Sequence, residues 1–148
     1  MRRILLATEG SACSNEAIQQ FTELFEDHPA ELFVLSVIAM PTYSFALPHE
    51  IEACNREADQ ALEALDQAIA DLARAGHAAH AMVRVGDPAQ TIVQVARELG
   101  AQLIVVGTHG RQGLERIVDG SVAEAVLRHA PCAVLVQPTV RAPVASRS

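Results

Sequence analysis

Residues 102–130, "QLIVVGTHGRQGLERIVDGSVAEAVLRHA", decide the fold because they join a strand pattern to a helix pattern through a glycine-rich segment. The run at 102–107 is aliphatic, and the run at 122–130 places apolar residues at helical spacing. Four glycines fall within residues 107–121, between the two runs. Because glycine within an element costs roughly 0.5–1 kcal/mol relative to alanine, such a cluster predicts tight turns or a ligand lying against bare backbone.

Aliphatic runs alternate with longer helical patterns over the whole chain, which is typical of βαβ units and a parallel sheet. Five strands are expected, at residues 3–8, 31–38, 79–85, 102–107 and 132–137. The first, fourth and fifth are nearly continuous aliphatic runs, as expected of strands covered by helices on both faces. The third alternates apolar residues with His80 and Arg84, which indicates an edge strand.

Four helices are expected in the connections. The first begins near Ser11 or Ser14 and carries four apolar residues at helical spacing, Ala17, Phe21, Leu24 and Phe25. The second covers about residues 50–75 and carries an apolar stripe that steps by three and four. A dimeric coiled coil could use such a stripe, but a single helix packed on a sheet uses it far more often. The stripe consists of Ile51, Cys54, Ala58, Leu62, Leu65, Ile69 and Leu72.

The remaining two helices have clear ends. Asp87 and Pro88 are typical of a helix start, and Gly100 is typical of a helix end. The last helix is expected to begin at Gly120-Ser121 and to end before Pro131.

These elements predict an α/β fold with a doubly wound, five-stranded parallel sheet and helices on both faces. Right-handed crossovers with one reversal favour the strand order 3-2-1-4-5. Ligands of such sheets bind beyond the carboxyl ends of the strands, where the order reverses between strands 1 and 4. The segments leaving those two strands are "TEGSACS" and the glycine-rich stretch.

The composition narrows the possible functions. The length of 148 residues predicts one domain over residues 1–138, followed by a disordered tail at 139–148. A net charge of −7 argues against binding to nucleic acid or to an anionic membrane. All eleven basic residues are arginine, which excludes a Walker A lysine and Schiff-base chemistry.

The sequence also indicates a cytoplasmic protein. No apolar run approaches the roughly 20 residues of a membrane span, and "ILLA" near the N-terminus is too short for a signal peptide. The three cysteines have neither a disulfide framework nor metal-binding spacing, so free thiols in a reducing compartment are expected.

The glycine stretch fits neither of two standard phosphate motifs. Its spacing differs from G-x-G-x-x-G, and no lysine completes a P-loop. The physical logic of phosphate binding still applies, because Gly120 and Ser121 would present free amides and a partial positive charge at a helix N-terminus. Gly107 and Gly110 would allow close approach of a ribose or a flat group, and Arg111 would screen phosphates or remain a solvated loop charge.

On these residues the chain resembles the universal stress proteins. The nucleotide-binding branch of that family carries G-x2-G-x9-G-[ST], which "GTHGRQGLERIVDGS" matches at every fixed position. The resemblance also covers "ILLATEGS", "GDPAQTIVQVARELGAQLIVVGTHG" and "GSVAEAVLRHAPCAVLVQP", and so nearly the whole chain.

The resemblance implies a site for ATP. Adenosine would lie against Ala7, Thr8, Glu9 and Val37. Val106, Gly107 and Gly110 would hold the ribose and first phosphate, and the phosphates would contact Gly120, Ser121, Val122 and Ala123. Glu9 replaces the family's usual aspartate, so its contact with adenosine or with ATP-bound Mg²⁺ would have a shifted geometry; the alternative is an exposed turn carboxylate.

The function expected from this resemblance is a nucleotide-dependent stress-response or signalling module with an unidentified protein partner. It would form a homodimer through its last strand, residues 132–137. No catalytic residue is predicted. Two alternatives stay open: a slow ATPase or nucleotidyl-transfer enzyme on the same fold, and a nucleotide-free dimeric interaction protein.

Overall fold

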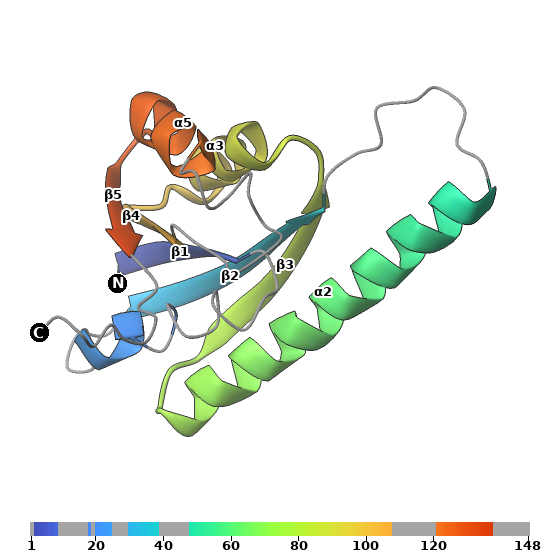
Figure 1. Ribbon diagram of the computed structural model, residues 1–148. Helices are drawn as coiled ribbons and strands as arrows, with labels where there is room; N and C mark the ends of the chain where they lie inside the picture. Colours follow the sequence, from blue (N-terminus) through green and yellow to red (C-terminus); the bar gives the residue numbers. More distant parts are fainter. Residues whose placement is uncertain are drawn as a thin grey trace, which may run out of the picture.

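The computed structural model describes residues 2–8, 18, 20–24, 30–38, 48–107 and 121–137 (Figure 1). The strands are β1 (Arg2–Thr8), β2 (Ala30–Ile38), β3 (Ala79–Val85), β4 (Leu103–Gly107) and β5 (Ala133–Gln137). The labelled helices are α2 (Pro48–Arg74), α3 (Pro88–Leu99) and α5 (Ser121–His129).

The strands form one parallel sheet with the order β3-β2-β1-β4-β5. This order confirms the doubly wound topology predicted from the sequence, with β3 at one edge. The order reverses between β1 and β4, whose shared register pairs Ile4 with Leu103 and Ala7 with Val106. The carboxyl ends of these two neighbouring strands therefore lie together.

Helices lie on both faces of the sheet (Figure 1), and an apolar layer of side chains packs on each face. Side chains alternate along β1, so that Ile4 and Leu6 face α2 while Leu5 faces α3 and α5. Leu5 and Leu6 are both completely buried. Full burial of a leucine side chain contributes roughly 1.5–3 kcal/mol, so this central strand anchors both layers.

Helix α3 has the ends that its sequence predicts. The Asp87 carboxylate accepts a hydrogen bond from the Gln90 backbone N–H at 3.0 Å, and Pro88 occupies the first turn. At the other end, Gly100 adopts a left-handed backbone with φ of 65°, and the Ala101 N–H donates to the Ala96 carbonyl at 2.9 Å. These caps fix where α3 begins and ends relative to the sheet.

Helix α2 departs from its prediction at two positions of the expected stripe. Ala61, Leu65, Ala68 and Leu72 are buried, whereas Ile51 and Leu62 are 49% and 47% exposed. Leu62 lies between the levels of the buried Ala61 and Leu65, but on a flank of the helix. Ile51 is exposed because of length: 27 residues of helix span about 40 Å, whereas the seven residues of β3 span about 23 Å. The N-terminal turns of α2 therefore extend past the sheet (Figure 1).

The first expected helix is described only at residues 18 and 20–24, which are helical. Ile18, Phe21 and Thr22 are buried, but Leu24, which the sequence groups with Phe21 by its spacing, is 65% exposed. At 100° per residue, Leu24 lies outside the face that Ile18 and Thr22 define. Ser11, Ser14, Ala17 and Phe25 lie outside the described residues.

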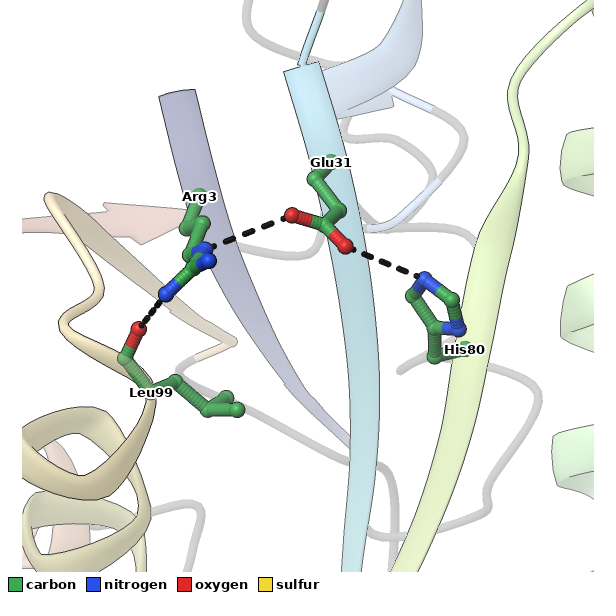
Figure 2. A network of polar contacts seen from close by, with 4 residues as sticks. All are labelled: Arg3, Glu31, His80 and Leu99. Carbon is green, nitrogen blue, oxygen red and sulfur yellow. Dashed lines mark hydrogen bonds and ion pairs between the residues drawn. The ribbon is translucent and has the colours of Figure 1, made fainter. Parts of the chain in front are cut away.

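A chain of polar contacts links three strands at their amino ends (Figure 2). Arg3 Nε lies 3.3 Å from Glu31 Oε1, and the other carboxylate oxygen lies 3.3 Å from His80 Nε2. Arg3 also donates to the Leu99 carbonyl at 2.8 Å, and the His80 ring stacks on Phe33 with centroids 4.9 Å apart. The contacts tie β1, β2, β3 and the end of α3 together at the edge opposite the strand carboxyl ends.

Candidate functional site

The candidate site lies at the carboxyl ends of β1 and β4, where the strand order reverses. Ala7 pairs in register with Val106 across these strands, and Gly107 ends β4. In doubly wound sheets this position leaves a crevice, because the connections from the two strands leave toward opposite faces.

Five of the residues expected at the site share one face of the sheet. They belong to the apolar layer under α3 and α5, in which Val106 and Ala123 are buried and the others are partly buried; the set is Ala7, Val37, Val106, Val122 and Ala123. Three strands and the first turn of α5 thus converge on a small apolar surface. Such a surface can contact the face of a planar base.

Helix α5 begins at Ser121, as the sequence predicts. The first backbone amides of a helix have no intrahelical acceptor, and the helix dipole places about half a positive charge there. Val122 and Ala123 lie in this first turn and also contact the apolar layer. Anion-binding amides and an apolar surface therefore meet at one edge of the sheet.

Thr8 and Ser36 lie on the opposite face, beside each other in register. Both are buried, with exposed fractions of 7% and 1%. The Ser36 hydroxyl oxygen has no hydrogen-bond partner within the described part of the chain. Thr8 is therefore close to the predicted site in the chain, but its side chain lies on the other side of the sheet from Ala7 and Val37.

Several predicted site residues lie outside the described residues. These are Glu9, Gly110, Arg111 and Gly120. Ser121 and Gly107 are described through their backbone alone. The predicted phosphate contacts of the loop and the predicted link from Glu9 to Mg²⁺ therefore stay predictions.

The β3–α3 turn is a neighbour of the site that the sequence did not single out. The Gly86 N–H donates to the Ile38 carbonyl at 2.9 Å, which holds this turn against the carboxyl end of β2. A Cβ on Gly86 would lie 2.9 Å from the Thr91 hydroxyl oxygen, closer than side chains tolerate. The sequence signal was the "GDP" triplet directly after an expected strand.

The site residues that the structure describes carry no ionisable side chain, so its electrostatics come from peptide dipoles and hydroxyl groups. Outside the site, Cys132 is a partly buried free thiol, and burial raises its pKa. In the described ranges, no group of three or more histidine, cysteine, aspartate or glutamate residues could hold a metal ion. The described helices also include none that is long and apolar enough to cross a membrane.

Comparison with known proteins identifies the family. Residues 1–138 match the family model described as "Universal stress protein family". The chain belongs to the universal stress protein family. It is 34% identical over 141 residues to a universal stress protein of Methanocaldococcus jannaschii, covering 91% of this chain and 81% of that protein.

Two further matches extend this result. A putative universal stress protein of Staphylococcus haemolyticus is 32% identical over 144 residues, covering 96% of this chain and 87% of that protein. The solved structure of the universal stress protein UspA from Lactobacillus plantarum superposes with a TM-score of 0.80 at 27% identity. That superposition covers 92% of this chain and 97% of the other. The family predicted from the glycine motif and the flanking strands is confirmed.

Proposed function

We propose that this universal stress protein binds ATP at the carboxyl edge between β1 and β4, and that nucleotide occupancy regulates its contact with a protein partner in a stress response. The observation that carries the proposal is the meeting of Ala7, Val37 and Val106 with the first turn of α5. An apolar surface beside helix N-terminal amides suits a base joined to phosphates.

Related structures support the nucleotide class. Solved universal stress proteins with 18–23% identity to this chain and TM-scores of 0.65–0.71 include complexes with cAMP, with AMP and with dAMP. The shared component of these three ligands is adenine joined to a pentose, ribose or deoxyribose, and one phosphate. Adenosine recognition by the apolar surface is therefore the part of the proposal that these structures support most directly.

In the proposal, different residues contact different parts of the nucleotide. Ala7 and Val37 contact the adenosine through their side chains and Thr8 through its backbone, and Gly107 with Gly110 leaves room for the ribose. Gly120, Ser121, Val122, Ala123 and Arg111 hold the phosphates, and Glu9 contributes through Mg²⁺ bound to the ATP. The separation of an apolar end from an amide-rich end sets the orientation of the nucleotide.

Turnover is expected to be slow. General acid–base catalysis requires a titratable group near the reacting phosphate, and the described site residues supply none. A slow ATPase remains the second candidate, and a nucleotide-free interaction protein is disfavoured because the glycine motif is complete in this sequence.

Two measurements test the proposal. Native mass spectrometry of the purified protein is expected to show co-purifying adenine nucleotide. Calorimetry is expected to show ATP binding that is much tighter than GTP binding, because the exocyclic group of guanine differs from that of adenine at the base edge. Equal affinity for the two nucleotides would show that the site does not select adenine, and the absence of ATP binding would refute the proposal.

A further inference from the structure

The outer edge of β3 pairs with no other strand in the part of the chain that the structure describes. β3 is the terminal strand of the sheet and pairs with β2 along its full length, Ala79–Val85. The strand contains neither proline nor glycine. Edge strands of this kind present unpaired backbone groups to any extended segment, and natural proteins normally protect them with charge, proline or a bulge.

The two longest polar side chains of β3 do not extend over this edge. His80 turns toward β2 and contacts Glu31 at 3.3 Å, as Figure 2 shows. Arg84 reaches α3, where both of its terminal nitrogens lie 3.3 Å from Glu98. Both side chains therefore lie over the α3 face of the sheet, and among the described residues no strand pairs with the outer backbone edge of β3.

The other face of β3 exposes apolar side chains. Ala79, Ala81, Val83 and Val85 alternate onto the face that α2 covers, where Ala79 and Val83 pack against the core. Ala81 is exposed, and Val85 is 57% exposed. The strand edge thus combines free backbone groups with an apolar surface on one side.

Helix α2 extends this apolar surface. One flank of α2, with Asp71 and Ala75, borders a cleft that Ile18 and Thr22 also line. Leu62 lies on the opposite flank of the helix, which faces the outer edge of β3. Leu62 lies about 15 Å along the helix from Leu72, and Val85 lies about 20 Å along its strand from Ala79, so the two exposed side chains are nearly level.

The flank of α2 beside this edge is acidic. Asp59 and Asp66 lie at helical positions adjacent to Leu62. In the described structure both carboxylates lack an ion-pair partner. A segment that pairs with β3 would therefore gain from basic side chains at its ends.

Charge also argues against a second copy of this chain at the same edge. Antiparallel pairing of two β3 strands about Met82 would bring the acidic flank of α2, with Asp59 and Asp66, toward the identical flank of the second copy. Like charges brought together at an interface oppose association.

We propose that the free edge of β3, with Val85 and the Leu62 flank of α2, binds an extended, basic segment of another protein as a sixth strand. Main-chain hydrogen bonds to β3 would supply affinity, as in other cases of strand addition. Small apolar side chains at alternate positions would contact Ala81 and Val85, and basic residues would approach Asp59 and Asp66. The surface lies on the far side of β2 from the proposed nucleotide site.

The test uses a capped peptide that alternates threonine with valine and has a lysine at each end. Two matched peptides replace both lysines with glutamate, or the central residue with proline. Amide NMR shifts and hydrogen exchange of the labelled full-length protein are followed during titration. The lysine peptide is expected to shift the NMR signals of β3 amides and to protect these amides from hydrogen exchange. The glutamate and proline peptides are expected to bind with an affinity lower by about tenfold or more.

Protein variants locate the site. Val85→Lys is expected to lower the affinity for the lysine peptide by about tenfold or more, because it places a charge at the outer edge of β3. Leu127→Lys is the matched control, since Leu127 is 53% exposed on α5 and lies away from β3. Combined Asp59→Lys and Asp66→Lys substitutions are expected to reverse the preference between the lysine and glutamate peptides.

Three results would overturn the proposal. One is the absence of any β3 amide response at millimolar peptide. The second is equal binding by the proline peptide or by the Val85→Lys variant. The third is a fall in the molar mass of the peptide-free assembly in solution when Val85 is replaced by lysine. That fall would place a second copy of the chain at this edge.

Discussion

Ala7 and Val106 lie side by side in register across β1 and β4, at the one place where the strand order reverses. Both contribute to the apolar layer that also contains Val122 and Ala123 from the first turn of α5. The sheet topology thus brings two ends of the glycine-rich segment, which are fourteen positions apart at Gly107 and Ser121, to one edge of the molecule.

Ser121→Ala is expected to weaken ATP binding moderately. Loss of one hydrogen bond to a charged group corresponds to about 1–2 kcal/mol, or roughly tenfold in affinity. Calorimetry measures the change. Because the same hydroxyl can cap α5, circular dichroism of the variant must first show unchanged helix content. An affinity equal to that of the parent protein would assign Ser121 to capping alone.

Glu9→Gln tests the proposed role of Mg²⁺. If Glu9 acts through ATP-bound Mg²⁺, the substitution should lower ATP affinity in the presence of the metal and leave it unchanged in EDTA. Equal losses under both conditions would instead indicate a direct contact with the nucleotide.

The protein is expected to bind ATP but to hydrolyse it far more slowly than a usual enzyme turns over its substrate. A usual enzyme turns over at about 1 per second or faster, and the described site residues lack a general base. Phosphate release under multiple-turnover conditions checks this expectation. Release near that rate, abolished by Gly120→Val, would establish the enzymatic alternative.

Burial of Cys132 makes the free energy of unfolding depend on pH in a definite direction. Burial raises the pKa of this thiol in the folded state above its value in the unfolded chain. The folded state therefore holds its proton more tightly, and the free energy of unfolding should fall as the pH rises through about 8–9. Alkylation in a background with serine at positions 13 and 54 should be slower for the native protein than in urea. Equal alkylation rates would contradict the burial effect.

A homodimer through β5 is the expected assembly. β5 is the second edge of the sheet, and Ala133 at its start is exposed. Light scattering should give about twice 15.8 kDa, and Ala133→Lys should shift the equilibrium toward the monomer. A parent protein that remains monomeric at micromolar concentration would refute this assembly.

Local signals made the fold predictable from the sequence. Asp87 and Gly100 mark the ends of α3 through their own backbone chemistry, and the aliphatic runs identify buried parallel strands. The strand order followed from the handedness of the crossovers, and its reversal point located the edge where Ala7 and Val106 meet.

Other features cannot be predicted from the periodicity of apolar residues, because they depend on how each helix and strand packs against its neighbours. Leu62 continues a regular apolar stripe, yet it is half exposed because it lies on a flank of α2 and not on the face that packs on the sheet. The sequence also gave no sign that Ser36 would be enclosed with an unpaired hydroxyl, because a serine within a strand pattern is equally compatible with exposure.

The most direct test of ATP binding at the glycine-rich segment is calorimetry on the parent protein, Gly120→Val and Gly113→Val. Gly113 is the matched control because it lies in the same segment but occupies no fixed position of the motif. A Cβ at the closest approach of a phosphate to helix N-terminal amides would displace it. Gly120→Val should therefore lose measurable ATP binding while its circular dichroism is unchanged, and Gly113→Val should retain the parent affinity. ATP binding by folded Gly120→Val at the parent affinity would contradict the proposed site.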